Sequence, residues 1–102
     1  MKNIILFILL AVPFNTMIAQ NQANNWYFGT YAGLDFSGPA PVAISSPMTT
    51  TEGTASISTA AGELLFYTNG VDIYDSTHTV MSNGSGMMGD VSTTQSAIIV
   101  PA

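Results

Sequence analysis

Residues 63–70 decide the fold, and they read Glu-Leu-Leu-Phe-Tyr-Thr-Asn-Gly. The Asn-Gly pair at 69–70 is a strong signal for a tight turn between two antiparallel strands. The run before it, 63–68, is almost continuously apolar, and the run after it, 71–74, alternates apolar with polar residues. Both runs have the length and composition of β-strands. The stretch therefore predicts a β-hairpin.

A third strand precedes this hairpin. Residues 54–59, Thr-Ala-Ser-Ile-Ser-Thr, alternate hydroxyl-bearing with small or apolar side chains, which is the period of a half-buried strand. A short Ala-Ala-Gly link at 60–62 joins them to the apolar run. Together the three segments predict an antiparallel meander with turns at 60–62 and 69–70.

The middle strand of this meander is apolar on both faces. Strict alternation places Leu64 and Phe66 on one side and Leu65 and Tyr67 on the other. A strand in a sheet with one face in water needs apolar side chains on one face only, whereas a strand in a sheet that is covered on both sides needs them on both faces. We therefore expect stacked sheets, as in a sandwich, a solenoid or the blades of a propeller. The alternative is a small open sheet with an incidental Leu65.

The rest of the chain after residue 25 shows further strand patterns and no helix of useful length. Aromatic or alternating runs predict strands at 26–31, 33–37, 42–44, 79–81 and 95–100. This indicates an all-β protein of antiparallel meander sheets. A four-stranded propeller blade takes roughly 40–45 residues, and a closed propeller needs at least about four blades. We therefore expect residues 26–102 to be an incomplete β-propeller, its first one to two blades, in a fragment of a longer protein.

The N-terminus has the organisation of a secretory signal. Lys2 precedes an apolar run at 4–12, and a short polar stretch then leads to Ala19 and Gln20. A charged start, a short apolar segment and a small residue at the cleavage position are typical of a signal peptide. A membrane span would need roughly 20 apolar residues. The sequence predicts a helical signal at 1–19, cleavage between Ala19 and Gln20, and a polar lead at 20–25. The alternative is a buried N-terminal element of the fold.

Composition excludes several classes of function. Lys2 is the only lysine or arginine, so the chain after residue 19 carries six carboxylates and no strong cation. Nucleic-acid binding is excluded, because contacts with phosphate require cations. The absence of cysteine excludes disulfides and thiolate metal sites. We expect an extracellular or outer-surface protein with no membrane span once the signal is removed.

The few groups that carry chemistry do not form a recognised site. His78 has hydroxyl neighbours and Asp75 nearby, but a surface turn explains it better than a catalytic triad. Asp72 and Asp75 lack the spacing of a calcium loop. Glu52 and Glu63 are formally available as a glycosidase pair, as any two acids would be. We predict no catalytic, metal or cofactor-binding residue.

Six segments of the chain follow one another in an order that is typical of one family of proteins. These segments are 25–29, 32–36, 52–58, 62–70, 80–84 and 92–101. With them, the chain resembles the N-terminal region of large Bacteroidetes surface proteins secreted by the type IX system, often described as gliding-motility-associated. Ser82 departs from this pattern, where proline is expected, and the C-terminal sorting domain of the family is absent.

The resemblance implies a propeller N-terminus, passage through the outer membrane, and display or release at the cell surface. With the composition, it predicts a non-enzymatic recognition or adhesion module. Its partners would be an extracellular protein or a glycan, and the remainder of its own chain. The alternative is the N-terminal part of an exported hydrolase, carbohydrate-active or similar, whose catalytic residues lie beyond residue 102.

Overall fold

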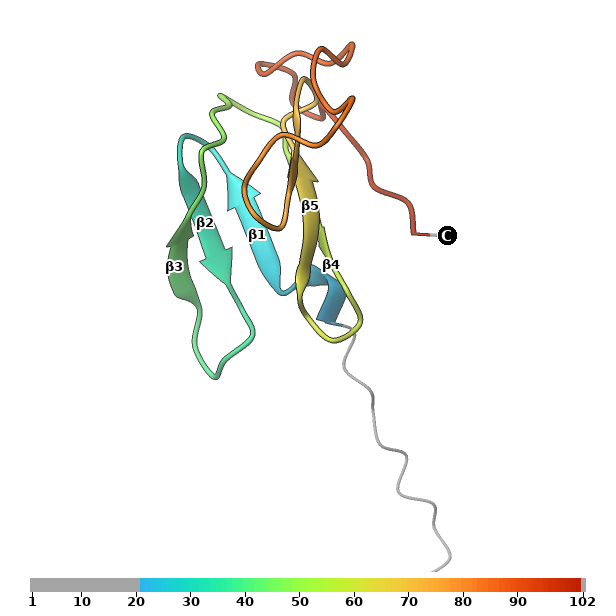
Figure 1. Cartoon of the computed structure of the whole chain (residues 1–102). Coiled ribbons are helices and arrows are strands. Elements are labelled where there is room, and N and C mark those ends of the chain that lie inside the picture. The colour runs from blue at the N-terminus through green and yellow to red at the C-terminus, as the bar shows by residue number, and fades with distance from the viewer. Residues whose placement is uncertain (1–20, 102) are drawn as a thin grey trace, which may run out of the picture.

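The computed structural model describes residues 21–101, and the predicted signal and its cleavage site at Ala19 and Gln20 lie outside them. The described residues form short strands and a single 3-10 turn, so the all-β prediction is confirmed (Figure 1). No helix in this part of the chain has the length and apolar character that crossing a membrane requires. The elements are η1 Asn21–Ala23, β1 Asn25–Phe28, β2 Ala32–Asp35, β3 Val42–Ser45, β4 Ala55–Ser58, β5 Leu64–Thr68 and β6 Ile73–Asp75.

The strands form two antiparallel meanders, β1-β2-β3 and β4-β5-β6, and the second is the predicted one. Strands β1 and β4, which are edge strands of the two sheets, lie side by side where the sheets meet (Figure 1). They run in opposite directions, because Asn25 at the start of β1 donates a 2.9 Å hydrogen bond to Ser58 at the end of β4. The β3–β4 connection passes over the β1–β2 turn, where the amide of Tyr31 donates to the carbonyl of Met48.

A β-bulge changes which side chains of β5 share a face. Ser56 pairs with Tyr67 and Ser58 pairs with Leu64, which leaves Leu65 as an extra residue. Ser56 and Ser58 are two apart and share a face, so Leu64 and Tyr67 share it too. The prediction that Leu65 and Tyr67 lie on the same face of the strand is therefore wrong. Leu65, the extra residue of the bulge, is 45% exposed, so the expectation that Leu65 is covered is wrong, whereas Phe66 is half-buried and Thr68 is buried.

The core is small and is built around aromatic rings. Tyr27, Met48 and Tyr67 are buried, and Ile44, Leu64 and Tyr74 pack against them. Alternation along β1 sends Tyr27 inward between two outward side chains. These six side chains join the two sheets, because they come from β1, β3, β5, β6 and the β3–β4 connection.

The predicted turn at Asn69-Gly70 is longer than a two-residue hairpin. Strand β5 ends at Thr68, which pairs with Ile73, so four residues form the connection. The buried Asn69 organises it: its Oδ1 accepts hydrogen bonds from the amides of Val71 and Asp72, and its Nδ2 donates to the carbonyl of Thr49. This amide thus satisfies three backbone groups that the wider turn leaves unpaired.

The two strands predicted near the C-terminal end are not formed. The segment 79–81 makes one bridge, between Val80 and Tyr74, and 95–100 forms no strand. The chain before 95–100 is instead fastened to the β3–β4 connection: the carbonyl of Val91 accepts hydrogen bonds from the hydroxyls of Thr50 and Thr51. Further bonds join Gly53 to Thr93 and Ser96. Hydrogen bonds between two loops therefore hold this segment, in place of the backbone hydrogen bonds of a β-sheet.

Candidate functional site

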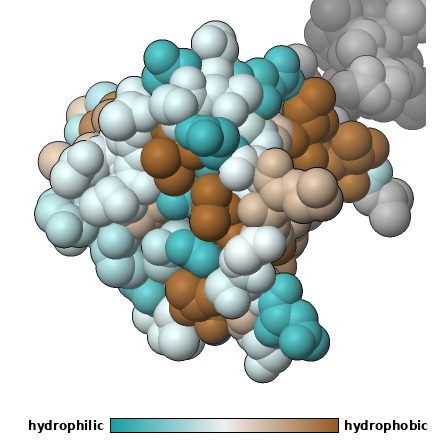
Figure 2. Space-filling view, turned by 90° about the horizontal axis from the view of Figure 1, so that it is seen from above, coloured by the Kyte–Doolittle hydropathy of each residue, from teal (hydrophilic) through white to brown (hydrophobic). Residues whose placement is uncertain are grey.

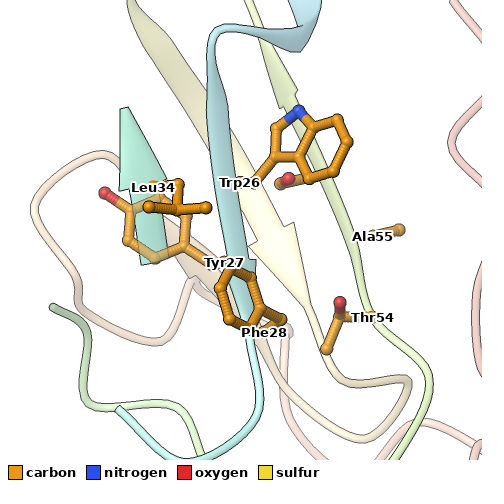
Figure 3. A pocket seen from close by; sticks show the side chains of 7 residues that line it. Trp26, Tyr27, Phe28, Leu34, Thr54 and Ala55 are labelled. Atoms are coloured by element: carbon orange, nitrogen blue, oxygen red, sulfur yellow. The ribbon is translucent and has the colours of Figure 1, made fainter. Parts of the chain in front are cut away.

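A hollow of about 530 Å³ lies between β1 and β4 and is the candidate binding site (Figure 3). Concave, mostly apolar hollows of roughly 300–1,000 Å³ are the usual form of small-ligand sites. One wall comes from β1 and β2, and the other comes from β4 and the residue that precedes it. The lining residues are Trp26, Tyr27, Phe28, Leu34, Thr54, Ala55 and Ser56.

The first wall presents aromatic rings to solvent. Because Tyr27 points into the core, its neighbours Trp26 and Phe28 point outward, and they are 51% and 39% exposed. Leu34 lies directly across from Trp26 in β2, on the same face. Large apolar side chains gathered around a hollow are typical of an interaction site.

The indole of Trp26 is held in one orientation although half of it is exposed. Its Nε1–H donates a 2.7 Å hydrogen bond to the carbonyl of Ala23, which lies in η1. Its ring packs against Phe36 with 5.2 Å between the ring centroids. Trp26, the only tryptophan in the sequence, lines the hollow and is 51% exposed (Figure 3).

The second wall carries hydroxyl groups. Thr54 and Ser56 line the hollow on either side of Ala55. The hydroxyl of Ser56 donates a 2.9 Å hydrogen bond to the carbonyl of Asn25, so β4 is tied to β1 beside the hollow. The oxygen of Ser56 keeps a lone pair that can accept a further hydrogen bond. The site therefore combines an aromatic wall with a hydroxyl-bearing one.

A second cluster, the tyrosine stack of Tyr27, Tyr67 and Tyr74, lies behind the hollow. The Tyr27 and Tyr67 rings are stacked at 4.3 Å, and the Tyr67 and Tyr74 rings at 5.1 Å. His78 Nδ1 lies 2.9 Å from the hydroxyl oxygen of Tyr67. His78 is in a turn, as predicted, but it is half-buried against the stack rather than free in water. The sequence gives no signal for this contact, because Tyr67 and His78 belong to different segments.

Burial of the stack raises the pKa of Tyr67 to about 12, against an ordinary value of 10. Burial also raises the pKa of Tyr27 and of Tyr74. A raised phenol pKa means that the folded state keeps its proton more firmly than the unfolded state. The stabilisation is therefore fully present below pH 10 and is lost as the pH rises from 10 to 12.

We expect the urea midpoint to be flat from pH 8 to 9.5 and to fall steeply above pH 10. The Tyr67→Phe variant has no phenol to ionise at this position, so its midpoint should fall less between pH 10 and 11. The measurement is urea unfolding followed by circular dichroism at each pH. Equal slopes for the wild type and the variant would contradict the assignment to Tyr67.

The acidic residues considered from the sequence are not brought together. Glu52 precedes β4 and Glu63 follows the turn after it, so the two lie toward opposite ends of that strand. The Asp75 carboxylate accepts hydrogen bonds from Thr77 and Thr79, and these bonds, that of the Thr77 side chain first, lower its pKa. Within residues 21–101, no three side chains of histidine, cysteine, aspartate or glutamate gather as a metal site would require.

Comparison of the chain with protein-family models, with curated proteins and with solved structures found no match. The hollow and its two walls are therefore the features of the molecule that bear on its function.

Proposed function

We propose that this protein is a non-enzymatic extracellular recognition or adhesion module that belongs to a larger secreted or cell-surface protein. The observation that carries the proposal is the hollow beside the exposed and fixed indole of Trp26. The signal pattern at 1–19 and the resemblance to type IX surface proteins support its location. The lining residues contain no acid, base or nucleophile other than hydroxyls, which supports binding rather than catalysis.

Exposed apolar side chains outside the hollow support the link to further protein. Figure 2 shows apolar areas on the face of the molecule that is seen from above. Ile98 and Val100, which the sequence pattern placed in a strand, are 70% and 80% exposed. Apolar surface of this kind is commonly covered by protein, which supports the remainder of its own chain as one partner.

For the finer architecture, we propose that the β4-β5-β6 sheet is part of one propeller blade. Its strands follow each other in sequence, and Val80 bridges to Tyr74 beyond β6, where a fourth blade strand would pair. Blades are related by rotation, so their equivalent strands run in the same direction. If β1 and β4, the first strand of each sheet, were equivalent, they would be parallel; because they are antiparallel, we propose that the β1-β2-β3 sheet is not a second copy of this blade.

The proposal is tested by retention of the purified protein on immobilised cellulose, mannan, starch and gelatin. We expect retention on at least one of these surfaces, and a loss of about tenfold or more in affinity for Trp26→Ala, as for a central aromatic contact. Val42→Ala is the matched control, because Val42 is 59% exposed on β3 and does not line the hollow. Circular dichroism verifies that each variant is folded.

Two results would overturn the proposal. One is the absence of retention on all four surfaces. The other is retention of a folded Trp26→Ala variant at the wild-type level, since the hollow would then take no part in binding.

A further inference from the structure

We propose that the ligand of the hollow is a neutral glycan, bound with one pyranose ring against Trp26. This inference rests on the proposed function and names the chemical class of the ligand. It is carried by three properties of the hollow: the opposed chemistry of its walls, the fixed orientation of its indole, and its lack of charge. Each property has a counterpart in the structure of a sugar.

The two walls match the two kinds of surface on a pyranose ring. Such a ring presents C–H groups on its faces and hydroxyl groups around its rim. The aromatic wall of Trp26 and Phe28 offers an apolar surface to a ring face. The wall formed by Thr54 and Ser56 offers hydroxyl groups to the rim. A purely apolar ligand would cover the Thr54 hydroxyl and the remaining lone pair of Ser56 without giving either a hydrogen bond, which disfavours it.

The fixed orientation of Trp26 favours a ligand that lies flat on its ring. The hydrogen bond to Ala23 and the contact with Phe36 hold the indole before any ligand arrives. A side chain that is already ordered loses little conformational entropy on binding. A volume of about 530 Å³ lies within the range of small-ligand sites, so a short stretch of a glycan chain can occupy it.

Charge selects neutral glycans over acidic ones. None of the lining residues is charged. The described part of the chain, 21–101, contains no lysine or arginine, while all six carboxylates of the sequence lie within it. A uronic acid, a sulfated sugar or a phosphate would therefore meet no cation and a field of the same sign. A neutral hexose carries no such penalty.

An extended peptide is a less suitable occupant. Peptides that add to a sheet need a free strand edge with unpaired backbone groups. The edge of β1 that faces β4 is bridged to it at Asn25, whose carbonyl accepts a hydrogen bond from Ser56 and whose side chain donates one to Ser58. A strand inserted here would have to break both bonds. The geometry therefore favours a ligand held by side chains.

The test uses the single tryptophan as its own reporter. The purified protein is titrated with cellohexaose, mannohexaose, maltohexaose and trigalacturonic acid while the fluorescence of Trp26 is recorded. We expect a saturable change with at least one neutral hexasaccharide and at least tenfold weaker binding of the acidic sugar. Calorimetry with the neutral hexasaccharide that binds should show an affinity about tenfold or more lower for Trp26→Phe and several-fold lower for Thr54→Val. The affinity of Val42→Ala should equal that of the wild type.

The outcomes separate this inference from the proposed function. Retention on gelatin without a response to any neutral sugar overturns the glycan inference and leaves a recognition module that binds protein. Binding of trigalacturonic acid as tight as that of the neutral sugars overturns the selection by charge. Unchanged neutral-sugar binding by both Trp26→Phe and Thr54→Val, with circular dichroism showing folded proteins, places the sugar elsewhere and overturns the inference. No response to any sugar and no retention on any surface overturns both proposals.

Discussion

Replacing Tyr67 with alanine is expected to lower the free energy of unfolding by about 3–5 kcal/mol, the usual cost of removing a buried aromatic ring. Tyr67 is fully buried, and its ring contacts Tyr27 on one side and Tyr74 on the other. Its removal therefore leaves a cavity where the two sheets meet. Domains of this size are stable by only about 5–15 kcal/mol, so one substitution should remove a large part of the total. Urea unfolding followed by Trp26 fluorescence measures the change.

Two variants separate the ring from its hydroxyl. Tyr67→Phe keeps the stacking and loses the hydroxyl that contacts His78 and Ser46, so we expect a loss of about 1–2 kcal/mol. Tyr31→Ala removes a tyrosine that is 58% exposed, and its effect should stay within about 1 kcal/mol. If Tyr67→Ala costs no more than Tyr31→Ala, the stack does not hold the sheets together.

Replacing Gly33 with alanine is expected to lower the free energy of unfolding by about 1–3 kcal/mol, in the range of overpacked cores. Gly33 lies in β2 between Tyr27 and Ile44 in the register of the sheet. An added Cβ would come within 2.8 Å of the carbonyl oxygen of Trp26 and 2.9 Å of side-chain atoms of Tyr27 and Ile44. The first of these is backbone, so β1 and β2 would have to move apart.

Gly38 provides the matched control for this substitution. A Cβ at Gly38 meets no atom closer than 3.9 Å, so Gly38→Ala should change stability by less than about 0.5 kcal/mol. Thermal and urea unfolding of the two variants, measured side by side, test the close approach of β1 to β2. Equal stability of the Gly33 and Gly38 variants would contradict the close approach of β1 to β2 at Gly33.

Most strands could be predicted because their signals are local. Alternation and aromatic content identified the segments that became β1 to β6, since a strand in a half-covered sheet needs apolar residues at every second position. The bulge could not be predicted in this way. Leu64 and Leu65 are both apolar, so the sequence does not reveal which of them leaves the core face. Leu65 is exposed because the register between β4 and β5 leaves it without a partner residue.

The error at 95–100 has a different physical cause. The segment alternates like a strand, but a strand forms only where a partner offers backbone groups in register. Ser96 instead donates to the carbonyl of Gly53, and the amide of Gly53 donates to the carbonyl of Thr93. These bonds join residues about 40 positions apart in the sequence, so no local sequence pattern predicts them.

The hollow could not be predicted from the sequence either, although most of its residues lie in predicted strands. Trp26 and Phe28 lie in the predicted strand at 26–31, and Thr54 and Ser56 lie in the predicted strand at 54–59. Only the fold places β1 beside β4, so the meeting of the aromatic and hydroxyl walls depends on a long-range contact. The same holds for His78, whose contact with Tyr67 follows from the turn after β6.

The claim that this protein binds through the Trp26 hollow is tested most directly by hydroxyl-radical footprinting of the protein while it is held on immobilised cellulose, mannan, starch or gelatin. Met88, which is fully exposed and does not line the hollow, is the internal control. On the surface that retains the protein, we expect Trp26 and Phe28 to be protected from oxidation and Met88 to be labelled as in free solution. Labelling of Trp26 that is unchanged in the retained protein would contradict the account.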